Sequence, residues 1–217
     1  MKKIVKICLI VLVAVLSLNA ILYFSSPKTR LKYSVLEATD VSKCSVYYGD
    51  NKDESDDKDV LVISCSMEST ENAMETMFVI KDIINNPENS ELSEKFDEAA
   101  VLIHEGGLPR ADVDVMLYRD DTGFYVRQIR FFKGVKFSEL SKFDLPKIHR
   151  FVFNGGILLD DAEDFENFSS LRIVHLNMDS KDFDDETLKE LQKTLPDCVF
   201  YFNDCDIDKY TVIGENS

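Results

Sequence analysis

The sequence predicts an α/β protein: an N-terminal membrane helix, then a βαβ-hairpin region, then a series of irregular strand–helix units. A basic, apolar N-terminus, apolar runs that alternate with amphipathic segments, and one recurring apolar spacing lead to this prediction. We expect five segments along the chain: a leader over residues 1–24, a linker over 25–40, an α/β region over 41–123, a repeat-like region over 124–210 and a tail over 211–217.

The leader has the composition of a membrane segment. Three lysines within the first six residues precede an apolar run from Ile7 to Phe24. A helix needs roughly 20 apolar residues to cross a bilayer, and the length of this run favours a retained single-pass anchor. A cleaved signal peptide is the alternative, with Leu18-Asn19-Ala20 as a passable cleavage site. Either alternative places the rest of the chain outside the cytoplasm. The protein would be anchored in the cell membrane if the leader is retained, and secreted if the leader is cleaved.

The charge of the chain narrows the classes of partner. Residues 25–217 contain 22 basic and 40 acidic residues, which gives a net charge of −18. Such a charge argues against nucleic acid and against an anionic lipid surface as the main partner. The hydrophobic content of 45% and the 15 phenylalanines are sufficient for a packed core, so the body of the chain is not of the disordered class.

The segment over 25–40 is expected to be a linker because its first residues, Ser25–Lys32, are polar and basic and include Pro27. The α/β region then begins with apolar runs that are typical of buried strands. The expected elements are the strand Val41–Tyr48, the strand Val60–Ser64, a helix between Ser69 and Asn85, the strand Ala99–Ile103 and a hairpin of Asp112–Tyr118 with Phe124–Phe132. Strand, helix and strand in this order predict a βαβ unit with parallel strands.

One apolar spacing recurs in the second half of the chain, with two residues and then one residue between apolar positions. The units are Val126/Ile129/Phe131, Ile148/Phe151/Phe153, Leu171/Val174/Leu176 and Cys198/Tyr201, where Asn203 breaks the pattern. Their starts are 22, 23 and 27 residues apart. Over residues 124–204 the pattern resembles leucine-rich repeats of the ribonuclease-inhibitor type, which implies stacked parallel strands. A plain α/β sheet with the same strand–helix spacing is the alternative.

This register places a set of basic and aromatic residues on one face of the expected sheet, because alternate residues of a strand point in opposite directions. The set is Arg127, Arg130, Phe132, His149, Arg150, Arg172, His175, Phe200 and Phe202. Arginine forks and aromatic rings on one face indicate a binding site for an acidic or carboxylate-bearing ligand. Alternatively, helices cover this face or nearby acids pair with the arginines, and a shift of one residue would reverse every side chain.

Four cysteines lie beyond the leader. Cys44 and Cys65 fall on two strands that are expected to be neighbours, so they are candidates for a disulfide in an oxidising compartment. Cys198 and Cys205 are more typical of buried thiols. The cysteine and histidine spacings do not match a zinc site, and we expect neither a metal nor another cofactor.

The common catalytic and nucleotide-binding motifs are absent from the sequence. The sequence therefore favours a non-enzymatic protein that binds another protein outside the cytoplasm and contacts the membrane through its N-terminal helix. Two alternatives remain open. One is an inhibitor or immunity-type protein that caps a cationic partner, and the other is an extracytoplasmic hydrolase without a recognisable motif.

Overall fold

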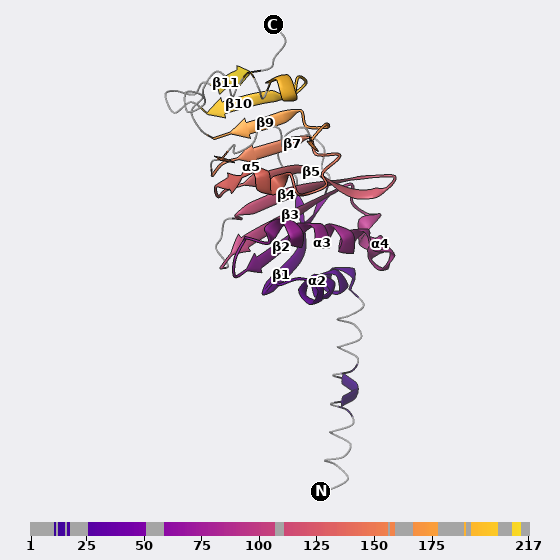
Figure 1. The fold of residues 1–217 in the computed structure, drawn as a ribbon. Coiled ribbons are helices and arrows are strands. Elements are labelled where there is room, and N and C mark those ends of the chain that lie inside the picture. Colours follow the sequence, from indigo (N-terminus) through magenta and orange to yellow (C-terminus); the bar gives the residue numbers. More distant parts are fainter. Residues whose placement is uncertain are drawn as a thin grey trace.

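The computed structural model describes residues 11, 13–15, 17, 26–50, 59–106, 111–155, 157–158, 167–177, 189, 192–203 and 210–213. Nine strands form one mixed sheet in which spatial order follows the order along the chain (Figure 1). They are β1 (Lys43–Asp50), β2 (Asp59–Met67), β3 (Glu98–Glu105), β4 (Val113–Asp120), β5 (Gly123–Phe131), β7 (Arg150–Phe153), β9 (Ile173–Leu176), β10 (Val199–Asn203) and β11 (Tyr210–Ile213). The predicted α/β class is confirmed.

The helices lie on the same side of this sheet (Figure 1). They are α2 (Pro27–Ala38), α3 (Ala73–Asn85), the short 3-10 helix η1 (Pro87–Asn89), α4 (Ser90–Ser93) and α5 (Phe137–Leu140). A separate parallel pair, β6 (Val135–Lys136) with β8 (Ile157–Leu158), flanks α5. Buried residues of α2, α3, α4 and α5 belong to one hydrophobic cluster with alternate residues of the strands, so the core lies between the helices and one sheet face.

The βαβ unit and the hairpin are both present. Strands β2 and β3 are parallel, and α3 connects them across the core face. Met77, Ile80 and Ile84 lie on one side of α3 and are fully buried, as their helical spacing predicts. Strands β4 and β5 pair antiparallel, with a bulge that makes Arg127 the extra residue of β5.

The repeated units form parallel neighbours in sequence order. Strand β5 pairs with β7, β7 with β9, and β9 with β10. The backbone N–H groups of His149, Arg172 and Val199 donate hydrogen bonds of 2.8, 3.0 and 2.8 Å to the carbonyls of Arg127, His149 and Arg172, respectively. The strand that follows Ile148 therefore lies beside the strand that follows Leu171, in parallel, as the recurring spacing predicts.

The prediction of a linker over residues 25–40 is wrong, because residues 27–38 form α2. Pro27 is tolerated in the first turn of a helix, where its missing N–H group has no partner to lose. Leu31 and Val35 are one turn apart and fully buried in the core at β1. The other residues of this helix are largely polar, so tertiary packing rather than amphipathic patterning stabilises it.

Most of the predicted membrane segment lies outside the described residues. Within it, residues 11, 13–15 and 17 are described, and all of them are helical and exposed. Val11 and Val13 are 56% and 55% exposed. Among the described residues, no helix is both long enough and apolar enough to span a membrane.

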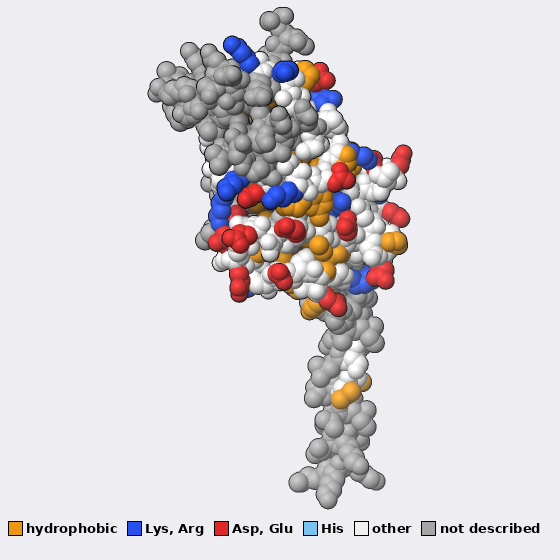
Figure 2. Space-filling view, viewed as in Figure 1, with side chains coloured by type: hydrophobic (Ala, Val, Ile, Leu, Met, Phe, Trp, Pro, Cys, Tyr) orange, Lys and Arg blue, Asp and Glu red, His pale blue; other side chains and the backbone are white. Residues whose placement is uncertain are grey.

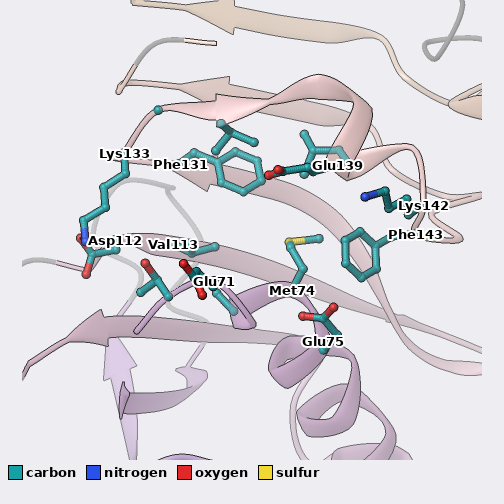
Figure 3. Close-up of a pocket in the computed structure, with 15 residues that line it drawn as sticks. Glu71, Met74, Glu75, Asp112, Val113, Phe131, Lys133, Glu139, Lys142 and Phe143 are labelled. Carbon is teal, nitrogen blue, oxygen red and sulfur yellow. The ribbon is translucent and has the colours of Figure 1, made fainter. Parts of the chain in front are cut away.

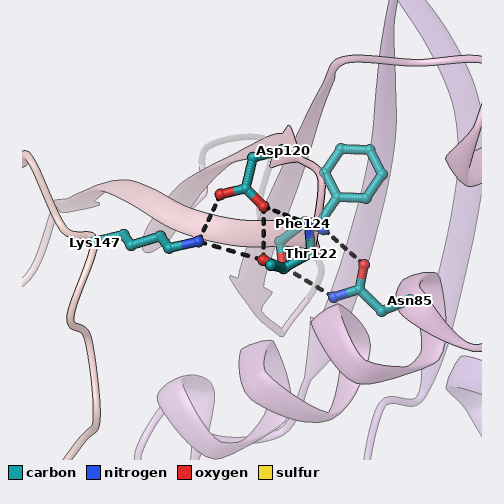
Figure 4. A network of polar contacts seen from close by, with 5 residues as sticks. All are labelled: Asn85, Asp120, Thr122, Phe124 and Lys147. Carbon is teal, nitrogen blue, oxygen red and sulfur yellow. Dashed lines mark hydrogen bonds and ion pairs between the residues drawn. The ribbon is translucent and has the colours of Figure 1, made fainter.

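A polar network attaches the β4–β5 turn to α3 (Figure 4). The Asn85 side chain accepts a hydrogen bond of 2.7 Å from the Phe124 N–H and donates one of 2.9 Å to the Phe124 carbonyl. Beside it, a hydrogen bond from the Lys147 ammonium, together with bonds from Thr122, lowers the pKa of Asp120 to about 2. Gly123 has a φ of +112°, and a Cβ there would lie 2.7 Å from Asn85 Oδ1.

We expect Asn85→Ala to lower the free energy of unfolding by about 1–3 kcal/mol, because two hydrogen bonds of a half-buried amide are lost together. Urea unfolding of the full-length chain, followed by far-UV circular dichroism, measures the change. Asn72→Ala is the matched control, since Asn72 precedes the same helix and its side chain makes no capping bond. An equal loss of unfolding free energy in the two variants would contradict a stabilising role of the Asn85–Phe124 hydrogen bonds.

Candidate binding face of the sheet

The sheet face opposite the helices is the candidate site, and we call it the open face. Every helix in the described ranges that contributes to the core packs on the other face. One row across the open face is Val62, Ala100, Met116, Gln128, Arg150, Ile173 and Val199, and the next is Ser64, Leu102, Asp114, Arg130, Val152, His175 and Tyr201. These residues alternate with core residues along each strand, as the period of a strand requires.

The half of the open face over β2–β4 is apolar. Val60, Val62 and Ala100 form a second hydrophobic cluster, separate from the main core, with Leu102 and Met116 packed against it. Val60, Val62 and Ala100 are themselves buried, at 6%, 8% and 8% exposure, so only Leu102 and Met116 at the margin of this cluster are partly exposed.

The other half of the open face is basic. His149 lies beside Arg127, Arg150 and Arg172, and we call these four residues the basic cluster. Partial burial lowers the pKa of His149, and the positive charges of the three arginines lower it further. Backbone hydrogen bonds of His149 to Arg127 and of Arg172 to His149 bring three of these predicted residues side by side on neighbouring strands.

Individual arginines of the basic cluster have local contacts that position them. The guanidinium of Arg127 lies over the ring of Tyr118, 4.8 Å from its centroid. Arg172 donates hydrogen bonds to the carbonyls of Ser169 and Leu171, at 3.0 and 2.8 Å. These contacts orient the guanidinium groups but do not neutralise their charges.

Arg130 follows the alternative prediction, in which an acid pairs with the arginine. Its guanidinium is 3.7 Å from the Asp114 carboxylate, which is 17% exposed. Burial raises the pKa of Asp114, and Arg130 offsets part of this effect. The ring of Phe132 lies 6.0 Å from the same guanidinium. Arg130 and Asp114 therefore separate the apolar half of the open face from the basic cluster.

Several buried polar atoms of the open face have no hydrogen-bond partner among the described residues. They are His104 Nδ1, Asp114 Oδ1 and Arg150 Nε, from β3, β4 and β7. The other ring nitrogen of His104 is 3.1 Å from Ser64 Oγ. Buried polar groups usually have hydrogen-bond partners. The three unpartnered atoms on this face therefore indicate unused hydrogen-bonding capacity.

The expected positions of Phe200 and Phe202 are wrong. Both are buried in the core, at 1% and 0% exposure, and Tyr201 lies on the open face instead. The fourth unit is one residue shorter than the third between its first two core positions, since Cys198 is followed by Phe200 whereas Leu171 is followed by Val174. This deletion shifts the register by one residue and reverses the side chains.

The run Cys198–Phe202 is continuously apolar and aromatic, so it does not show which face each residue occupies, and the polar Asn203 at an expected core position is the one local sign of the shift. The ring of Tyr201 lies 5.8 Å from that of His175, across the β9–β10 pair. Tyr118 and Asp114 were also missed, because their roles depend on pairing between β4 and β5.

The two candidate disulfide cysteines are directly opposite each other on β1 and β2. Their sulfur atoms are 3.9 Å apart, and both residues are buried free thiols in this structure. The pKa of Cys65 is raised because its thiol donates a hydrogen bond to Cys44 and because it is buried. Burial likewise raises the pKa of Cys198 to about 12, and Cys205 lies outside the described residues.

Among the residues that the structure describes, no three His, Cys, Asp or Glu side chains are arranged to hold a metal ion. Comparison of the chain with protein-family models, with curated proteins and with solved structures gives no significant match.

We expect Arg172→Gln to raise the pKa of His149, because one of the three repelling charges is removed. The imidazole resonance, assigned with a His149→Gln variant, reports this pKa by NMR titration. Arg30→Gln is the control, since Arg30 pairs with Glu91 on the helix-bearing side. A shift of the His149 pKa in the control but not in Arg172→Gln would contradict the basic cluster.

The lowered pKa of His149 also predicts how stability depends on pH. The unfolded chain binds a proton more readily than the folded chain, so stability falls as the pH drops from about 6.5 toward the folded pKa. His149→Gln should reduce this loss in urea unfolding between pH 7 and pH 5, while Gln substitution of the exposed Arg30 should leave it unchanged.

We expect Cys44 and Cys65 to form a disulfide under oxidising conditions, because they face each other on paired strands. The bridge should increase the free energy of unfolding by about 3 kcal/mol. Peptide mapping of the alkylated protein by mass spectrometry detects it, with Cys198→Ser as the control that retains the bridge. Absence of the bridge after oxidation, with Cys44 still alkylated, would refute this prediction.

Proposed function

We propose that the chain is a non-enzymatic binding protein whose open face binds an acidic protein outside the cytoplasm. The leader would hold it at the membrane, or the protein would be secreted if the leader is cleaved. The observation that carries this proposal is the basic cluster on the open face of a chain with a net charge of −15. A concentration of positive charge against the overall charge is typical of a local binding site rather than of general solubility.

The chemistry of the open face suits a partner that combines carboxylates with apolar residues. Guanidinium groups bind carboxylates through paired hydrogen bonds, and Arg150 Nε is a buried donor without a partner among the described residues. Tyr201 and Tyr118 add aromatic surface beside these charges. Leu102 and Met116, the partly exposed margin of the second apolar cluster, offer a small area for hydrophobic burial next to them.

The arrangement of the strands supports a leucine-rich-repeat-like organisation of the second half. Four consecutive strands, β5, β7, β9 and β10, are parallel neighbours, and the repeated spacing gives each of them the same core positions up to the shift in the fourth unit. Stacked units of this kind present an extended, nearly continuous strand surface for a partner. The basic cluster would form one column of that surface.

A second candidate is an inhibitor-like protein that caps a cationic partner, and the net charge of −18 outside the leader favours it. Ionic strength separates the two proposals. Binding of a cationic partner through scattered surface acids should weaken steeply with salt. Binding at the open face should weaken less, because added salt also screens the long-range repulsion between two acidic proteins.

Site-specific photo-crosslinking tests the proposal in native membranes. A photoreactive residue in place of Ile173, on the open face, should capture a protein with an acidic surface. The double variant Arg127→Glu/Arg172→Glu should reduce this capture at least tenfold, because two attractive charges become repulsive.

The double variant Arg30→Glu/Lys136→Glu makes the same change of charge away from the open face, and it should leave the capture unchanged. Equal capture by all three proteins would remove the basic cluster from the binding site. Capture that is lost only in the Arg30/Lys136 variant would locate the partner on the other side of the molecule.

A further inference from the structure

A cleft of about 510 Å³ lies on the helix-bearing side, between the start of α3 and the β6–α5 segment (Figure 3). It is located at the edge where the parallel strands β2, β3 and β5 end. Ligands of open α/β sheets bind in crevices at this carboxyl edge. The volume is within the range of small-molecule sites, which is about 300–1,000 Å³.

The floor of the cleft is apolar. Met74 of α3 points between Phe131 and Phe143 (Figure 3), and Leu140 of α5 also lines the cleft. Met74 and Phe131 are only 7% and 3% exposed, so they belong to the packed core. The ring of Phe143 stacks on Phe78 at a centroid distance of 5.4 Å. An apolar ligand group would therefore meet a floor that is already ordered.

The wall formed by residues 133–135 is also held in place. The ammonium group of Lys133 pairs with Glu105 and lies 3.3 Å from Asp112, whose carboxylate accepts a bond of 2.7 Å from the Glu105 N–H. A Cβ on Gly155 would lie 2.2 Å from the backbone of Lys133, so only glycine permits this approach. The charge of Lys133 is thus already neutralised and does not attract an anion.

The remaining charges at the rim are mainly negative. Glu71 and Glu75 lie at the start of α3, and Glu139 comes from the opposite wall, whereas Lys142 is the remaining cation of the lining (Figure 3). None of these three glutamates forms an ion pair with another described residue. Figure 2 shows the same pattern, with acidic side chains beside exposed apolar ones on this side of the molecule.

We propose that this cleft binds a small organic cation with an apolar body, with the apolar part against Met74 and Phe131 and the cation near Glu71 and Glu75. Neutral apolar ligands lack the attraction of the rim, and anions are repelled by it. The cleft shares no residue with the basic cluster, so this site is independent of the binding function proposed for the open face.

Three probes with the same apolar body test the proposal: 4-phenylbutylammonium, 4-phenylbutanol and 4-phenylbutyrate. They are titrated into the full-length chain in zwitterionic nanodiscs, and the methyl resonance of Met74 is followed by NMR. Met116, on the open face, is the internal control. We expect the cation to shift Met74 with saturation, the alcohol to bind at least threefold more weakly, and the anion at least tenfold more weakly.

The double variant Glu71→Gln/Glu75→Gln should weaken binding of the cation at least threefold and leave binding of the alcohol unchanged. Glu88→Gln, which removes an exposed acid of η1 outside the cleft, is the matched control and should bind like the unmodified chain. Equal affinity for the three probes, an unchanged Met74 resonance, or the same loss in the Glu88 variant would overturn the proposal.

Discussion

The structure depends on burial of one face of a nine-stranded sheet beneath all of its core-forming helices. Crossovers between parallel strands have one hand, so consecutive connections return on the same side of the sheet. Leu145, Phe168 and Leu195, which precede β7, β9 and β10, are all buried in the same core. The second face therefore receives no core-forming helix from the described chain, although Val62, Ala100 and Val152 on it are buried among their neighbours.

The backbone ladder of the parallel strands explains how an acidic protein keeps a basic cluster. Hydrogen bonds join Arg127 to His149 and His149 to Arg172, so their side chains emerge from neighbouring strands about 4.8 Å apart. Like charges at this spacing repel one another, and this repulsion adds to partial burial in lowering the pKa of His149. Burial of the core residues on the reverse of each strand holds the register against this repulsion.

Much of this arrangement could be predicted from the sequence, because Val60–Ser64 and Ala99–Ile103 are continuous apolar runs and the second half repeats its core spacing. The sequence pattern within one segment did not predict those features that are determined by packing between distant segments. Helix α2 presents only Leu31 and Val35 to the core, so its sequence resembles a linker. In the fourth unit, the deletion of one residue moved Phe200 into the core. The repeated spacing of the first three units does not predict this shift. The cleft lies between α3 and the β6–α5 segment, which are far apart in the sequence, so no local pattern contains it.

The β4–β5 pair connects the two proposed sites physically. Val113 and Phe131, which are directly paired, line the cleft on one side of the sheet. Asp114 and Arg130, the adjacent pair in the same ladder, separate the two halves of the open face on the other side. Because successive residues of a strand point to opposite faces, a shift of one residue in this pair would exchange the two environments. The Asn85 clamp at the hairpin turn opposes such a shift, so the register of one hairpin maintains an acidic cleft and a basic surface on opposite faces of the same sheet.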